Sequence, residues 1–165
     1  MTPSGVTPAP SGKGPLVRVP TPPAPLEPAR WRRFFLPQTA DAATFRVGDR
    51  TIRVSGVAAP AADASCGLAE GGGWPCGATA LHSLRMFLRG RPVECYFPAV
   101  DGVADVTAPC RVGETDLGQW LLGQGWATPD GLATPEYRAV AEDARCARRG
   151  IWRNEAPVSP CAATN

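Results

Sequence analysis

The chain has 165 residues, of which 44% are hydrophobic and 19% charged, so it can bury a core and is not generally disordered. Its formal net charge of +2 excludes a strongly basic protein that holds nucleic acid mainly through phosphates. No apolar run has the length of a signal-peptide core or a membrane-spanning helix. These features indicate one globular domain with an appendage.

Residues 1–29 are dense in Pro, Gly, Ser and Thr and carry few large apolar side chains. Such a segment cannot bury enough surface to offset the entropy of ordering. We therefore expect a disordered, polyproline-like linker, serving either as a stalk or as an inert tail. The expected domain covers residues 30–155, and residues 156–165 form a C-terminal tail.

The domain begins with a strand near residues 34–36, followed by a hairpin over 44–57 that turns at Gly48-Asp49. The Ala-, Gly- and Pro-rich residues 58–76 predict a loop. The next segment predicts a helix that Gly90 ends. One face of that helix carries Ala80, Leu81, Leu84, Phe87 and Leu88.

Residues 92–97 and 106–112 predict two further strands, joined by a turn around Asp101-Gly102. A short helix over 114–125 then carries Leu117, Trp120 and Leu121. The last helix has Thr134 as its N-cap, Pro135 at its first position, Arg148 and Arg149 in its last turn and Gly150 as its stop. This order of elements predicts a small β-barrel with helices packed on it.

Six cysteines form an even set without the spacing of a zinc site, which favours three disulfides and an oxidising compartment, periplasmic or extracellular. A cytosolic protein with six free thiols is the alternative. Cys95 and Cys110 lie in neighbouring predicted strands, Cys66 and Cys76 would close the loop, and Cys146 and Cys161 would tie the tail to the last helix. The other connectivities stay open.

Five segments follow one another in the order and spacing of a known family: VGDRTIRVSGVAAP, WPCGATALHSL, PVECYF, APCRVGETDLGQWLLGQGWA and PEYRAVAEDARCARRGIW. Over residues 31–153 the chain resembles the staphylococcal nuclease-like (thermonuclease) family, in its secreted bacterial branch. The resemblance implies an α+β fold, a five-stranded OB-fold β-barrel with three packed helices. Fold alone does not settle function.

Active members of that family hold Ca²⁺ with two aspartates, activate water with a glutamate and stabilise the phosphate with two arginines. The resemblance places Ala43 and Ala58 at the aspartates, Ala61 at the glutamate, and Arg53 and Asp105 at the arginines. Only Arg53 keeps its residue type. We therefore expect no Ca²⁺ binding and no cofactor. Asp41 and Asp63 are the acidic residues that could partly compensate.

Other chemistry-bearing residues favour structural roles. His82, the only histidine, lacks a catalytic partner motif, and Arg53 could pair with a surface carboxylate rather than bind phosphate. Packing in the core is expected for Trp120, Trp126, Trp152 and Tyr137, although tryptophans can also stack on bases. The segment of residues 30–35 mixes cations and aromatics, as a contact to nucleic acid or an anionic surface would, and it also opens the first strand.

The leading functional hypothesis is a non-catalytic nuclease-like module that binds or scaffolds in the bacterial envelope, as a monomer with an unidentified partner. One alternative is a Ca²⁺-dependent nuclease with relocated acidic residues. A second alternative is an OB-fold binder of single-stranded nucleic acid or glycan.

Overall fold

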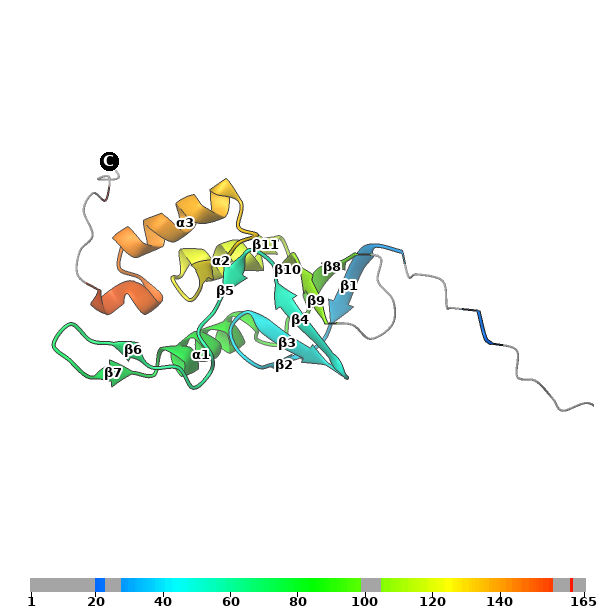
Figure 1. The fold of residues 1–165 in the computed structure, drawn as a ribbon, viewed down its shortest axis with the longest axis horizontal. Coiled ribbons are helices and arrows are strands. Elements are labelled where there is room, and N and C mark those ends of the chain that lie inside the picture. The colour runs from blue at the N-terminus through cyan, green and yellow to red at the C-terminus, as the bar shows by residue number, and fades with distance from the viewer. Residues whose placement is uncertain (1–19, 23–27, 99–104, 156–160, 162–165) are drawn as a thin grey trace, which may run out of the picture.

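The computed structural model describes residues 20–22, 28–98, 105–155 and 161, and shows an α+β fold with three α-helices (Figure 1). One sheet has the strand order β2-β3-β4-β9, with β2 (Gln38–Thr39), β3 (Thr44–Val47), β4 (Arg50–Val54) and β9 (Val106–Ala108). A second sheet has the order β1-β8-β10-β11, with β1 (Arg30–Phe34), β8 (Val93–Phe97), β10 (Cys110–Val112) and β11 (Thr115–Asp116). Two short pairs, β5 (Val57–Ala58) with β12 (Thr128–Pro129) and β6 (Cys66–Gly67) with β7 (Gly73–Trp74), complete the strands described.

The helices are α1 (Cys76–Leu88), α2 (Leu117–Gly123) and α3 (Pro135–Cys146), followed by the 3-10 helix η1 (Gly150–Asn154). Helices α2 and α3 lie side by side, and the β6–β7 hairpin lies at the end of the domain opposite β1 (Figure 1). Side chains cap two of the helices. Asp116 accepts a hydrogen bond from the Gln119 N–H at the start of α2, and Thr134 accepts one from the Tyr137 N–H at the start of α3.

The predicted hairpin over 44–57 is confirmed, since β3 and β4 pair in antiparallel register across the Gly48-Asp49 turn. Strand β4 also pairs in parallel with β9. Pro109 separates β9 from β10 because proline has no N–H to donate to a ladder. The predicted strand over 106–112 is therefore two strands, one in each four-stranded sheet.

The core lies between these sheets and the helices. Phe45, Ile52 and Phe97 are almost fully buried from the strands, as are Leu84 of α1 and Leu121 of α2. The predicted apolar face of α1 is confirmed, with only Phe87 left partly exposed. Alternation along β8 sends Val93, Cys95 and Phe97 inward and the intervening side chains outward.

Three details of the sequence prediction are wrong or incomplete. The first strand ends at Phe34, and Phe35 and Leu36 lie outside it at a bend. The segment 58–76 is not wholly a loop, because it includes the β6–β7 pair. Helix α3 ends at Cys146 rather than at Gly150. Two backbone bonds close its end, from the Arg148 N–H to the Arg145 carbonyl and from the Arg149 N–H to the Ala144 carbonyl, with Arg148 at φ +54°.

All six cysteines are paired, and the predicted pairing is the one observed: Cys66–Cys76, Cys95–Cys110 and Cys146–Cys161. Three disulfides fit an oxidising compartment. The α+β class with three helices is confirmed. The described strands do not form one closed sheet, so the five-stranded OB-fold barrel stays a prediction. Most of the linker 1–29, the turn at 101–102 and most of the tail lie outside the described residues.

Candidate functional site

The sheet β2-β3-β4-β9 brings together three of the five positions that the nuclease resemblance assigns to catalysis. Thr44 of β3 and Thr107 of β9 lie opposite Arg53 of β4 on its two sides. Ala43 immediately precedes Thr44, and its carbonyl accepts the Val54 N–H at 2.9 Å. Asp105 immediately precedes β9. The pairing registers therefore place Ala43, Arg53 and Asp105 on neighbouring segments of one sheet.

Asp105 occupies this site as an acceptor. Its Oδ2 lies 3.9 Å from Nη1 of Arg53, and its Oδ1 accepts the backbone N–H of Thr51 at 3.0 Å. Both side chains of the ion pair are more than half exposed. Arg53 thus pairs with a surface carboxylate. A phosphate approaching Arg53 would have to displace that carboxylate and meet its negative charge.

Ala43 is buried, with 4% of its surface exposed, and a methyl group offers no ligand atom. Asp41, two residues earlier, is engaged within its own segment. Its Oδ1 accepts the N–H of Ala43 at 2.7 Å, so this carboxylate closes a local turn. One of its two oxygens is therefore directed at the backbone of its own segment.

The remaining positions lie on other segments of the chain. Ala58 lies in β5, paired with Thr128, and its side chain is exposed. Ala61 and Asp63 are exposed in the segment between β5 and β6. The carbonyl of Ala61 packs so closely on Gly77 of α1 that a Cβ at Gly77 would lie 1.8 Å from it. This segment is fixed by packing on α1.

These residues do not fit a Ca²⁺ ion. Ca²⁺ takes six to eight oxygen ligands, and carboxylates supply most of the attraction. Of the five positions that the nuclease resemblance assigns, three carry methyl groups, one is Arg53, and one is the carboxylate of Asp105, which Arg53 and the Thr51 N–H contact. Within the described part of the chain, Glu142 with Cys146 and Cys161 is the one group of ligand types close together. Its two sulfurs are bonded to each other, so they are not thiolate ligands.

A second polar surface lies on the outer face of β1, β8 and β10. Trp31 lies opposite Tyr96, with ring centres 5.6 Å apart, and the Arg111 guanidinium lies 4.2 Å from the Trp31 ring centre. Trp31 and Tyr96 are 44% and 40% exposed. Glu94 lies beside them and accepts hydrogen bonds from Arg33 and Arg111, at 2.7 and 2.9 Å from their Nε atoms. These two bonds lower the pKa of Glu94, so the carboxylate is ionised at neutral pH.

We define the outer aromatic surface as Trp31, Tyr96 and Arg111. The sequence pointed to the segment of residues 30–35, which includes Trp31, but not to Tyr96 or Arg111. The alternation of β8 carries the needed information, because it places Glu94 and Tyr96 on the face opposite the buried Cys95 and Phe97. The neighbour of Trp31 across the ladder could not be read without the register of β1 on β8.

The other candidates lie where structural roles predict. His82 is exposed on α1. Trp120, Trp126 and Tyr137 are partly buried and pack against the core. Trp152, for which core packing was also expected, lies in η1 and does not belong to the core cluster of the described residues. The Tyr137 hydroxyl donates to Oδ1 of Asp116 at 2.5 Å. Burial, then this bond, raises the pKa of Tyr137 well above its usual value, so the phenol is a structural donor at neutral pH.

Comparison of the chain with protein-family models and with curated proteins found no match. Among the described residues, no helix combines the length and the hydropathy needed to cross a bilayer.

Proposed function

We propose that this chain is a non-catalytic domain of the staphylococcal nuclease-like type that acts as a binding or scaffold module in the bacterial envelope, periplasmic or extracellular. One observation carries the loss of catalysis. The position that should clamp phosphate holds Asp105, which pairs with the one remaining site arginine, Arg53. The three disulfides support an envelope location.

The order of the strands supports the OB-type barrel that this proposal includes. The sheet β2-β3-β4-β9 continues through Pro109 into β10, which pairs with β8, which in turn pairs with β1. Residues 35–37 then lead from β1 back to β2. These pairings and chain connections link the two four-stranded sheets in the order that the proposed barrel requires.

The test is cleavage of a fluorescent single-stranded and double-stranded DNA substrate, with Ca²⁺ and with a chelator. The proposal predicts background rates in both conditions. Loss of one transition-state contact commonly costs roughly 10²–10³-fold in rate, and this chain lacks several. Ca²⁺-dependent cleavage that disappears in Asp41→Ala or Asp63→Ala would establish the alternative, a nuclease with relocated acidic residues.

The outer aromatic surface favours a second candidate function, binding of single-stranded nucleic acid or glycan. Exposed aromatic faces stack on bases or sugars, and Arg111 adds a cation beside them. The test is salt-dependent retention on single-stranded DNA and on immobilised glycans. Trp31→Ala should abolish retention, whereas Leu132→Ala, which removes another exposed apolar side chain, should not. Equal retention of both variants would remove this candidate.

A further inference from the structure

The bend between β1 and β2 exposes two large apolar side chains next to each other. Phe35 is 69% exposed and Leu36 is 78% exposed, whereas the preceding Phe34 packs against the core. Single exposed apolar residues are ordinary, but they carry more meaning when they are contiguous. Here Phe35 and Leu36 are adjacent and both exposed, so together they form a small apolar patch at the surface.

Leu36 also holds a strained backbone conformation, with φ at +47°. Glycine adopts positive φ freely, whereas a leucine does so at a cost. The side chain of Leu36 cannot offset that cost by core packing, because more than three quarters of its surface is exposed. Strain at an exposed apolar residue points to a contact made outside this chain.

Two hollows of about 230 and 390 Å³ lie on either side of the bend and share Leu36 and Pro37. Five arginines line them, and no acidic residue does: Arg85, Arg89 and Arg91 line the first, and Arg33 and Arg46 the second. Leu88 adds to the apolar floor of the first hollow. The bend is therefore an apolar point with positive charge beside it, supplied mainly by the first hollow, because Arg33 of the second is paired with Glu94.

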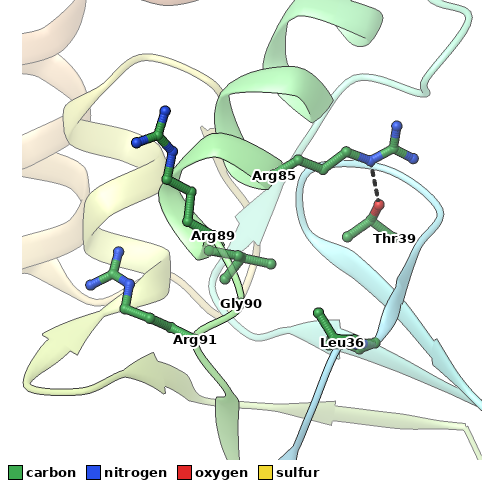
Figure 2. A pocket seen from close by; sticks show the side chains of 8 residues that line it. Leu36, Thr39, Arg85, Arg89, Gly90 and Arg91 are labelled. Carbon is green, nitrogen blue, oxygen red and sulfur yellow. Dashed lines mark hydrogen bonds between the residues drawn. The ribbon is translucent and has the colours of Figure 1, made fainter.

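The three arginines of the first hollow keep donors for a partner. Arg85 uses Nε to donate to Thr39 at 3.0 Å, and Arg91 donates to the Phe87 carbonyl with its guanidinium 4.5 Å from the Phe87 ring centre. No ion pair of Arg85, Arg89 or Arg91 occurs within the described residues. Figure 2 shows the guanidinium of Arg85 on one side of the hollow and those of Arg89 and Arg91 on the other. The three cations border the hollow and do not converge on one point.

We propose that this bend docks on an anionic lipid bilayer. Phe35 and Leu36 enter the boundary between headgroups and acyl chains, and Arg85, Arg89 and Arg91 contact lipid phosphates around them. A separated set of cations matches a surface that bears many phosphates better than it matches one small anion. A nucleic acid would favour several aromatic faces for stacking, and Phe35 is the one aromatic residue exposed at the bend. The proposal does not depend on the nuclease resemblance.

The experiment is co-sedimentation of the full chain with vesicles, one set of phosphatidylglycerol mixed with phosphatidylcholine and one set of phosphatidylcholine alone. The protein should sediment with the anionic vesicles and weakly with the neutral ones, and salt should reduce the binding. Phe35→Ser/Leu36→Asn should weaken binding at least about tenfold by removing apolar area. Asparagine is chosen at position 36 because it tolerates positive φ. Arg89→Glu should weaken binding by about tenfold or more through its reversed charge.

Two matched controls separate docking from general effects. Leu132→Ser removes an equally exposed apolar side chain, and Arg138→Glu on α3 makes the same charge change as Arg89→Glu. Both should bind anionic vesicles as the wild type does, and all variants should keep its circular dichroism and melting temperature. Absence of binding, equal binding to both vesicle types, or equal losses in the controls would overturn the proposal. Wild-type vesicle binding by a folded Phe35→Ser/Leu36→Asn variant would also overturn it. So would a variant of the bend that loses binding to single-stranded DNA and keeps binding to vesicles.

Discussion

The guanidinium of Arg53 lies 3.9 Å from the carboxylate of Asp105, and the same carboxylate accepts the backbone N–H of Thr51. Two positions that the nuclease resemblance assigns to phosphate-binding arginines are thus a cation and an anion that satisfy each other. The ion pair joins β4 to the start of β9 on the outer face of the sheet. The pair is therefore part of the surface electrostatics of the sheet β2-β3-β4-β9.

We expect this ion pair to contribute little stability, because both of its side chains are more than half exposed. Exposed pairs are commonly worth about 0.2–1 kcal/mol, and screening by salt reduces that further. Arg53→Gln should therefore lower the free energy of unfolding by no more than about 1 kcal/mol. Urea unfolding at low and high salt measures this, with Arg46→Gln as the control on β3. A much larger loss for Arg53→Gln alone would show that the pair is a structural element of the fold.

The disulfides Cys95–Cys110 and Cys146–Cys161 form a matched comparison, because both have a sequence separation of 15. The chain-entropy contribution, about 3 kcal/mol for such a loop, should be the same for both. Cys95 and Cys110 are buried in the core, whereas Cys146 and Cys161 are partly exposed. Replacing the first pair by alanine should therefore cost more, since it also leaves a cavity. Urea unfolding of the two double variants decides this, and equal losses would contradict it.

Tyr137 should make stability depend on alkaline pH. Its pKa is raised in the folded state, while a tyrosine in the unfolded chain ionises near pH ~10. The stability it contributes is present below about pH 10 and is lost as the pH rises further, because ionisation then favours the unfolded chain. In Tyr137→Phe, unfolding at neutral pH should be easier by about 1 kcal/mol for the lost hydrogen bond. The loss of stability above about pH 10 should then be smaller than in the wild type.

A spectrophotometric titration provides the direct readout. The chain has two tyrosines, so Tyr96→Phe leaves Tyr137 as the only phenol. Its phenolate absorbance should appear only with unfolding or well above the usual tyrosine pKa of about 10. Ionisation of Tyr137 near pH 10 in a folded protein would contradict the hydrogen bond to Asp116.

Substitutions at Gly150 and Gly48 separate two causes of lost stability, steric clash with a nearby backbone and an unfavourable backbone conformation. Their φ angles are similar, +54° and +59°. A Cβ at Gly150 would lie 2.1 Å from the Gly125 carbonyl oxygen, whereas a Cβ at Gly48 would meet nothing within 4 Å. Gly48→Ala should cost about 1–2 kcal/mol from its conformation alone. Gly150→Ala should cost clearly more, as thermal or urea unfolding would show, and equal costs would mean that η1 moves away freely from the Gln124–Gly125 segment that follows α2.

Much of the fold followed from local patterns. The hairpin over 44–57, the core face of α1 and the N-cap of α3 depend on neighbouring residues, and their periodicity and capping chemistry are visible in the sequence. The predicted end of α3 at Gly150 was wrong. Arg148, which lacks glycine's conformational freedom, takes the positive-φ position that closes the helix. The break at Pro109 was visible in the sequence, but its consequence, a strand shared between two sheets, depends on long-range pairing.

The candidate site shows the same division. The sequence allowed two interpretations of Arg53, a phosphate-binding residue or a partner of a surface carboxylate. The pairing of β4 with β9 brings Asp105 beside it, and Asp105 is its partner in the ion pair. The turn that Asp41 closes was not predicted, because its hydrogen bond to the Ala43 N–H depends on local backbone geometry. This bond occupies one of the two carboxylate oxygens that a metal ion would use. The bend at Phe35 and Leu36 was predicted as strand because Phe34, Phe35 and Leu36 form an apolar run, whereas the observed strand Arg30–Phe34 contains three arginines.

The measurement that tests the central claim most directly is Ca²⁺ titration calorimetry of the wild type, paired with DNA cleavage in the same buffer. We expect no saturable heat in the millimolar range and cleavage at background, because alanines stand where the nuclease resemblance places both aspartates, and Asp105 would repel phosphate. As a positive control, Ala43→Asp/Ala58→Asp/Ala61→Glu/Asp105→Arg should gain metal-dependent cleavage. Sub-millimolar Ca²⁺ affinity in the wild type, with cleavage that is lost together with it in Asp41→Ala or Asp63→Ala, would contradict the account.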